Sequence, residues 1–417
     1  MKKPRLWRAV VRPEAGRRLE RHLQAENVGR LAGELRDGLH DPAFPLLLRR
    51  IDDAPILPGN RVDVFFRGEN AFEAMGQAID AAREEVLVES YILKDDSTGR
   101  AFLDAVGRAA ARGVNVRVLA DAWGSLTTRR SFWREMKRRG VEARLFNPLF
   151  PHLLFQPFRD HRKILVVDRR VAFTGGMNIA DEYGSGVGSS TGPWRDTHCR
   201  VEGPTAWELA VVFSEAWRRA GGRLDFEPLS PPASARASIL VLDSRPGRGY
   251  EETASALAAI VGGAREKVWI TNAYFAPRAR AVRILAEAVR RGVDVRLLLP
   301  GKSDVPLVRH AGHGYFRALL ELGVRVYEYG AAILHAKTLV ADDFVSVVGS
   351  TNLDFRSFHL NAEANLVILD AESGRAFADA FRDDLTRSVE IDGDGWTRRA
   401  GLHRIGDNLA RRLGPLL

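Results

Sequence analysis

Apolar strand-like runs alternate with amphipathic helix-like stretches through most of the chain. Residues 86–92 and 114–119 have the β-branched composition of buried strands, whereas 71–83 and 99–112 repeat apolar residues at helical spacing. Gly113 directly follows the second of these helices, as is typical of a helix C-terminus. The alternation predicts an α/β fold in which helices cover a sheet.

The same order of elements recurs in the second half of the chain. Residues 268–274 and 293–298 repeat the strand pattern, and 280–291 repeat the intervening helix. The tripeptide Arg-Gly-Val marks the corresponding point in each half, at 112–114 and 291–293. This repeat predicts two tandem α/β domains, each a mixed β-sheet flanked by helices, related by pseudo-twofold symmetry.

Changes of composition predict the domain boundaries. We expect a first domain at 59–222 and a second at 237–390, joined by a proline-rich linker at 223–236. A basic helical extension at 1–58 precedes them, and a basic amphipathic tail at 391–417 follows. Each terminal segment fits two roles: contact with an anionic membrane surface, or packing on the body of the protein.

Overall composition narrows the class of partner. The 417 residues are 45% hydrophobic and 28% charged, which is ordinary for a globular protein, and the net charge of +9 favours an anionic partner such as nucleic acid or anionic lipid. The lone Cys199 excludes an intrachain disulfide and suits a reducing compartment. We expect no membrane-spanning segment and no secretory signal, because no apolar run is long enough.

One motif with reactive side chains occurs once in each half, with identical internal spacing. It reads His-Arg-Lys at 161–163 and His-Ala-Lys at 335–337, and each copy continues with an aspartate, a Gly-Gly or Gly-Ser pair and an asparagine. The predicted catalytic residues are His161, Lys163, Asp168, His335, Lys337 and Asp342. The predicted substrate-binding and orienting residues are Gly175, Gly176, Asn178, Asp196, Gly349, Ser350, Asn352 and Glu363.

These residue types at this spacing favour phosphate chemistry without a metal or cofactor. The histidine and lysine, two residues apart, project from one face of a strand. We expect the aspartates at hairpin turns, as positioning residues rather than proton carriers. The small residues allow close approach of the backbone to a ligand, and each asparagine is predicted to open a helix whose N-terminus favours an anion.

Each histidine is expected to have a carboxylate that orients its ring. We pair Asp196 with His161 and Glu363 with His335, because each acid follows its histidine within the same half. The longer separation in the first half matches a flexible Gly/Ser-rich insertion at 184–192.

The two motifs resemble those of the phospholipase D superfamily, and the stretches 194–204, 304–309 and 334–365 are similar to bacterial cardiolipin synthases. The resemblance covers about 60–390 and is to a shorter branch without N-terminal membrane spans. It implies transfer of a phosphatidyl group from one phosphatidylglycerol to the hydroxyl of a second phospholipid, with release of glycerol. By analogy, His161 is the nucleophile that forms a phosphohistidine and His335 the acid and base, although near-symmetry allows the reverse.

Three other functions remain open at this point. Water as acceptor would give a phospholipase D-type hydrolase, the superfamily also contains nucleases and other phosphodiesterases, and a non-catalytic phosphate-binding scaffold is a further alternative. The apolar, proline-broken loop at 148–158 favours lipid contact, so we expect anionic phospholipid as partner, no nucleic acid, and a peripheral position on the cytoplasmic face of the cell membrane.

The remaining histidines and aromatic residues are given structural roles. His310 and His313 are spaced like a metal pair, but no Cys, Asp or Glu at a matching spacing accompanies them, so we expect no metal and a surface or headgroup contact. His198 is interpreted as a packed strand residue, and Tyr91 and Tyr274 as core aromatics.

Overall fold

The computed structural model describes residues 25–52, 54–148, 158–186, 192–224, 235–397, 407 and 410. Most of the predicted lipid-contact loop, the Gly/Ser insertion, the linker and the C-terminal tail, together with residues 1–24 of the N-terminal extension, lie outside these ranges. No helix within the described part of the chain combines the length and apolar character needed to cross a bilayer.

The predicted strands and helices of the first half are confirmed to within a few residues. Its elements are β1 (Ile56–Phe65), α4 (Gly68–Ala81), β2 (Glu85–Ser90), α5 (Ser97–Ala111), β3 (Asn115–Asp121), α6 (Arg130–Arg138), β4 (Glu142–Phe146), β5 (Arg159–Asp160), β6 (Lys163–Val167), β7 (Val171–Gly175), β8 (His198–Glu202) and α7 (Pro204–Arg219).

The second half repeats this order without a counterpart of β5, and it adds α11 before β15 and a strand and helix after α12. Its elements are β9 (Ala237–Ser244), α8 (Tyr250–Gly263), β10 (Lys267–Asn272), α9 (Ala279–Arg290), β11 (Asp294–Pro300), α10 (Pro306–Glu321), β12 (Arg325–Tyr329), β13 (Lys337–Ala341), β14 (Val345–Gly349), α11 (Phe355–His359), β15 (Asn361–Leu369), α12 (Ala371–Leu385), β16 (Ser388–Glu390) and α13 (Gly393–Thr397).

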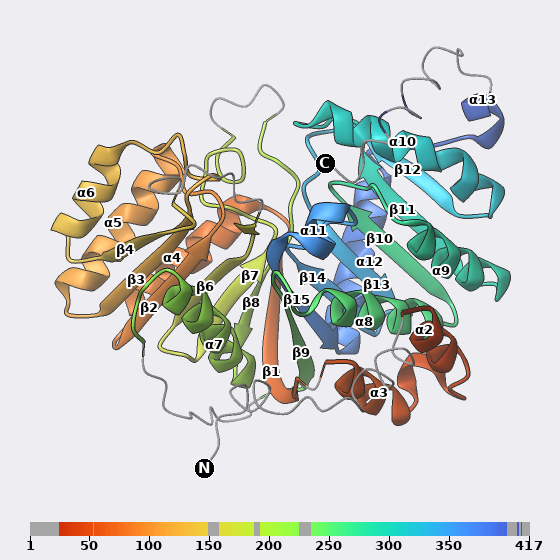
Figure 1. The fold of residues 1–417 in the computed structure, drawn as a ribbon, viewed down its shortest axis with the longest axis horizontal. Helices are drawn as coiled ribbons and strands as arrows, with labels where there is room; N and C mark the ends of the chain where they lie inside the picture. The colour runs from red at the N-terminus through yellow and green to blue at the C-terminus, as the bar shows by residue number, and fades with distance from the viewer. Residues whose placement is uncertain are drawn as a thin grey trace.

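The sheets of the two halves join into one continuous sheet. Its order is β16-β12-β11-β10-β13-β14-β15-β9-β1-β8-β7-β6-β2-β3-β4, and the antiparallel pair β1–β9 forms the seam at the centre of Figure 1. In each half three parallel strands, β2-β3-β4 or β10-β11-β12, continue into antiparallel ones. The mixed α/β fold is as predicted, but the halves share a sheet rather than owning separate ones.

Helices cover both faces of this sheet. In the first half α4, α5 and α6 pack on one face, while α7 lies on the other. In the second half α8, α9 and α10 pack on one face, and α12 lies on the other. The residues of α7 and α12 belong to one hydrophobic core that runs beneath both halves. Each half is therefore buried against the other as well as against its own helices.

The described part of the N-terminal extension packs on the second half. It forms α2 (Ala25–Gly33), a 3₁₀ turn η2 (Gly38–His40) and α3 (Ala43–Asp52), all in the same core as α8 (Figure 1). Gly29 of α2 and Gly262 of α8 bring the two backbones together, since a Cβ on Gly262 would lie 2.0 Å from the Gly29 carbonyl oxygen.

Candidate active site

The motif side chains lie at the start of two corresponding strands. Lys163 begins β6 and Lys337 begins β13, and each motif histidine stands two residues earlier. All four side chains are buried, with His161 8% and His335 4% exposed. Burial of four basic groups without solvent is unfavourable unless carboxylates accompany them.

Two short backbone contacts carry each histidine to the opposite half. β5 pairs in parallel with the start of β15, and the His161 amide donates to the Ala362 carbonyl at 2.9 Å. In the mirror arrangement, the His335 amide donates to the Arg195 carbonyl at 2.8 Å. Each histidine therefore lies beside the residue that immediately precedes the other half's acid.

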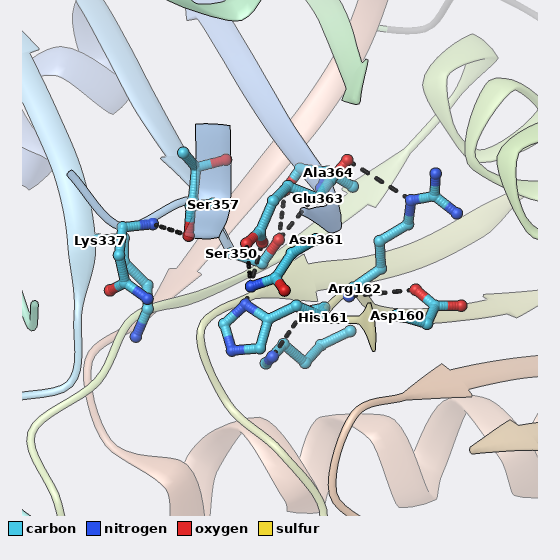
Figure 2. A network of polar contacts seen from close by, with 12 residues as sticks. Asp160, His161, Arg162, Lys337, Ser350, Ser357, Asn361, Glu363 and Ala364 are labelled. Atoms are coloured by element: carbon cyan, nitrogen blue, oxygen red, sulfur yellow. Dashed lines mark hydrogen bonds and ion pairs between the residues drawn. The ribbon is translucent and has the colours of Figure 1, made fainter. Parts of the chain in front are cut away.

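The carboxylates are paired across the halves, so the pairing predicted from the sequence is wrong. Nδ1 of His161 lies 3.0 Å from Oε2 of Glu363, and Nδ1 of His335 lies 2.7 Å from Oδ2 of Asp196. Figure 2 shows His161 beneath Glu363, with Asn361 beside the same carboxylate. Spacing within one half identified the correct acids but carried no information about this exchange.

Electrostatics favour ionised acids and neutral imidazoles in this site. Burial raises the pKa of Glu363, but the larger combined effect of His161 and Lys163 brings this pKa below its usual value. Asp196 behaves in the same way: burial raises its pKa, and His335 and Lys337 together bring it below the usual value. Burial lowers the pKa of His161, and burial together with Lys337 lowers that of His335 to about 4. A carboxylate that accepts from Nδ1–H leaves the lone pair on Nε2.

The lysines are the groups whose charge changes near neutral pH. Burial lowers the pKa of Lys163 to about 7 and that of Lys337 to about 8, and Lys337 lowers that of Lys163 across the interface. Lys163 Nζ donates to the His161 carbonyl at 2.5 Å, and Lys337 Nζ lies 3.2 Å from His335 Nε2. The effect of Lys337 on the pKa of Lys163 indicates that the two ammonium groups lie close enough to interact across the interface of the halves.

The small residues after each motif make room for the orienting carboxylates. A Cβ on Gly176 would lie 2.1 Å from Oδ1 of Asp196, so only glycine fits there. Ser350 occupies the equivalent place in the second half, where its hydroxyl helps to lower the pKa of Glu363. The sequence predicted that the backbone at these positions approaches a ligand closely. In the structure, this backbone instead packs closely against the orienting side chains and the neighbouring strands.

The prediction that a helix starts at each motif asparagine is wrong. Asn178 starts no helix, because its Oδ1 accepts from the Ile92 amide and its Nδ2 donates to the Tyr183 hydroxyl. Asn352 precedes the short helix α11, but Asp354 is the N-cap. Oδ1 of Asn352 is buried and has no hydrogen-bond partner among the described residues.

The motif aspartates lie at the opposite end of their strands from the lysines. Asp168 and Asp342 have φ of 49° and 51°, a left-handed conformation that suits a tight hairpin turn. The Asp168 carboxylate accepts three backbone amides at 2.8–2.9 Å, those of 83–85, and Asp342 accepts those of 265–267. This geometry agrees with a positioning role rather than proton transfer.

Aromatic rings around the histidines are the main feature that the sequence did not predict. The ring of Tyr91 lies 5.0 Å from that of His161, and the ring of Tyr274 lies 5.9 Å from that of His335. Tyr183 and Trp194 also lie within 5.5 Å of the His335 ring. The core assignment of Tyr91 and Tyr274 is therefore corrected; their equivalent positions in the repeat were the signal available.

Two arginines beside the site support the crossed carboxylates. Arg162 is buried, reaches Glu89 and Asp243, and directs its Nε at the Glu363 carbonyl (Figure 2). Arg195 makes a two-bond ion pair with Asp384 of α12 and donates to the Asp196 carbonyl at 2.8 Å.

The other histidines lie away from these rings or behind them. His198 is buried on β8 as expected, and burial lowers its pKa to about 4. His313 is buried rather than at the surface, and its Nε2 contacts Glu328 at 2.8 Å. An acid does accompany the pair: Asp407 lies 2.9 Å from His310, and these three are the group in the described residues that could hold a metal ion. Contacts at 2.9 Å with His310 and 3.8 Å with His313 tie Asp407 to α10.

Comparisons with known proteins agree with this geometry. A family model described as "Cardiolipin synthase, PLD-like domain" matches residues 75–184 and 257–385. Cardiolipin synthase 1 of Bacillus anthracis is 33% identical over 384 residues, 89% of this chain and 75% of that protein. Cardiolipin synthase 2 of Bacillus cereus is 36% identical over 390 residues, 92% of this chain and 76% of that protein.

Solved structures share the fold at lower identity. Phosphatidylserine synthase from Haemophilus influenzae has a TM-score of 0.67 at 14% identity, over 88% of this chain and 96% of that one. Polyphosphate kinase from Porphyromonas gingivalis has a TM-score of 0.54, also at 14% identity, over 84% of this chain and 50% of that one.

Proposed function

The chain belongs to the cardiolipin synthase family of phospholipase D-like proteins, and we propose that it transfers a phosphatidyl group between two phospholipids. One observation carries this proposal: two buried His–Lys pairs from opposite halves each have their histidine Nδ1 held by the other half's carboxylate. Such a site offers a nucleophile, a proton carrier and two cations to one phosphodiester.

The first step would form a phosphohistidine. Nε2 of His161 attacks phosphorus, and the bond from phosphorus to the oxygen of the headgroup glycerol breaks. Protonated His335 gives its proton to this departing oxygen. Lys163 and Lys337 offset the negative charge on the phosphoryl oxygens. Without these cations, that charge would repel the lone pair of the attacking imidazole. An anionic substrate raises the pKa of the neighbouring imidazoles and lysines, so binding itself favours the protonated acid.

The second step would return the histidine to its starting state. Neutral His335 accepts the proton of an incoming hydroxyl, the hydroxyl oxygen attacks phosphorus, and the bond between phosphorus and Nε2 of His161 breaks. The product is cardiolipin when the hydroxyl belongs to a second phosphatidylglycerol. Buried catalytic groups limit access of water, which would otherwise give phosphatidic acid.

The donor and location are part of the same proposal. We propose phosphatidylglycerol as donor and a peripheral position on the cytoplasmic face of the membrane. The net charge of +9 supports attraction to an anionic lipid surface, and the lone cysteine, Cys199, suits a reducing compartment.

Incubation with phosphatidylglycerol vesicles and mass spectrometry of the lipids tests the activity. We expect cardiolipin and glycerol, and a loss of at least about a thousandfold in the His161→Ala and His335→Ala variants. Phosphatidic acid as the sole product would instead establish a hydrolase, and no lipid product at all would overturn the proposal.

A donor with an acidic leaving group separates the two histidines. Release of p-nitrophenol from phosphatidyl-p-nitrophenol needs no general acid, so His335→Ala should give one rapid turnover whereas His161→Ala should give none. The opposite result would exchange the two roles.

A further inference from the structure

An apolar cavity of about 190 Å³ lies between the sheet and the helices of the second half. Its walls come from β10, β13 and β14 on one side and from α8, α9 and α11 on the other. Representative lining side chains are Leu242, Leu257, Ile270, Ile284, Leu339 and Val347. In Figure 1 these helices lie together over that half of the sheet.

The cavity ends at the candidate active site. Lys337 lines it, and so do Asn272 and Asp354. Leu339 follows Lys337 by two residues on β13, so both side chains project from the same face of the strand. The apolar space therefore continues directly from the ammonium group that is proposed to hold the phosphate.

The same end is also lined by half-buried and exposed residues: the Tyr250 hydroxyl donates to the Asn361 carbonyl close to Glu363, and α9 follows β10, whose Asn272 pairs with Lys337. Tyr250 and Glu251 at the start of α8, together with Arg278 and Arg280 around the start of α9, line this end. Arg280 is paired with Glu251 at 3.2 Å, while the Arg278 side chain lies over the Phe355 ring. A cavity with a polar, cationic mouth beside the catalytic lysine and apolar walls behind it has the polarity of a phosphate with its esterified fatty acid.

We propose that this cavity holds one acyl chain of the donor phospholipid while its phosphate lies between Lys163 and Lys337. This inference rests on the proposed function and adds where the diacylglycerol part of the donor is held. Its consequence is that chain length contributes to catalytic efficiency in the monomeric lipid, since each methylene moved from water into an apolar site is worth about fourfold in affinity.

Ala281 of α9 and Ala254 of α8 provide cavity-filling variants. Both line the cavity and are only partly buried, so an aromatic ring at either position narrows the space without entering the core. Ala279 is an exposed alanine of the same helix that does not line the cavity, so Ala279→Phe is the matched control.

The experiment measures kcat/KM for phosphatidylglycerols from dibutyryl to dioctanoyl, each below its micelle concentration. For the wild-type protein and Ala279→Phe, kcat/KM should rise about fourfold for each methylene added to the bound chain, until the cavity is full. For Ala281→Phe and Ala254→Phe the rise should disappear, so that kcat/KM for the dioctanoyl lipid falls to about the value for the dibutyryl lipid in the same variant. Thermal unfolding of all variants identifies any that fail to fold. If one cavity-filling variant does not fold, the other still tests the proposal.

The outcomes separate this inference from the proposed function. A wild-type protein that is active but equally efficient across the series overturns the acyl site. Chain-length dependence that survives in both filling variants also overturns it. No transfer from any phosphatidylglycerol overturns the proposed function itself.

Discussion

At the scale of single residues, the crossed carboxylates are the feature on which the proposed chemistry depends most. The sequence identified both histidines and both lysines because the motif is repeated with fixed spacing, and both acids because each follows its motif once the Gly/Ser insertion is allowed for. It could not identify which acid meets which histidine, because the pairs join residues 202 and 139 positions apart. The β5–β15 pairing and the equivalent bridge between Arg195 and Leu334, which no local pattern predicts, bring each acid to its partner.

Replacement of one carboxylate by an amide should affect the histidine of the other half. In Glu363→Gln we expect kcat to fall by about 10²–10⁴-fold, because the Nδ1 proton loses its charged acceptor and the wrong tautomer becomes accessible. Imidazole ¹⁵N NMR should show a changed Nδ1 signal for His161 alone, and Asp196→Asn should change that of His335 alone. A change at His335 in Glu363→Gln would contradict the crossed arrangement.

The two lysines should set the alkaline limit of activity. The pKa of Lys163 is lowered to about 7 and that of Lys337 to about 8, so rising pH through this range removes the positive charges that bind the phosphodiester. We therefore expect kcat/KM to decrease between about pH 7 and 8, and kcat to decrease only at higher pH because bound phosphate raises both pKa values. A pH–rate profile checks this. Lys337→Arg should lower the overall rate and shift the alkaline decrease of kcat/KM to higher pH. An unshifted decrease would exclude Lys337 as its source.

A single methyl group at Gly176 should disturb catalysis through Asp196. The added Cβ would lie 2.1 Å from Oδ1 of Asp196, which forces the carboxylate away from His335. We expect kcat of Gly176→Ala to fall by about 10²-fold or more, as for loss of an orienting group. The matched control is Gly76→Ala in α4, where a Cβ meets nothing within 4 Å and helix propensity predicts a gain of about 0.5–1 kcal/mol in stability. Equal activity in the two variants would contradict the argument.

At the scale of elements, periodicity predicted strands and helices well but not the conformation of the segment after each motif. The segment after Asn178 is used for another purpose: the Asp181 carboxylate accepts the Thr98 amide at the start of α5, and the Asp181 amide donates to Asp96. Side chains that cap a neighbouring helix in this way hold their own segment outside a helix. Local sequence cannot reveal a cap supplied to an element that lies far away in the chain.

The hairpin aspartates should matter for stability rather than for chemistry. Asp168→Ala removes the acceptor of three backbone amides, so we expect the free energy of unfolding to decrease by about 1–3 kcal/mol. At a temperature where the variant remains folded, kcat should stay within a few-fold of the wild-type value. Denaturant unfolding and a lipid assay on one preparation check both parts; a large loss of kcat in fully folded protein would give Asp168 a role in the reaction.

At the scale of the whole molecule, the two halves form one body. The repeat predicted two similar domains, but a repeat does not reveal that β1 and β9 join their sheets or that α7 and α12 share a core. Those contacts arise between surfaces that each half, taken alone, would expose to water. Shared burial on this scale favours cooperative unfolding.

Calorimetry of the intact protein should therefore show one main unfolding transition. Seam variants that replace buried Ile239 of β9 with Ala should lower the unfolding temperature of the whole protein, because Ile239 belongs to the shared core. Hydrogen exchange should report equal loss of protection around both motifs. Two separated transitions, with only one shifted by the variant, would show that the halves unfold independently.

The crossed pairing also has a consequence for the order in which the residues of the site are synthesised on the ribosome. His161 is translated long before Glu363, and Asp196 long before His335. A nascent chain that has folded its first half holds an imidazole without its carboxylate and a carboxylate without its imidazole. Both histidine–carboxylate pairs are therefore complete only after residue 363 has emerged, so we expect chains that end before it to lack an oriented His161 ring.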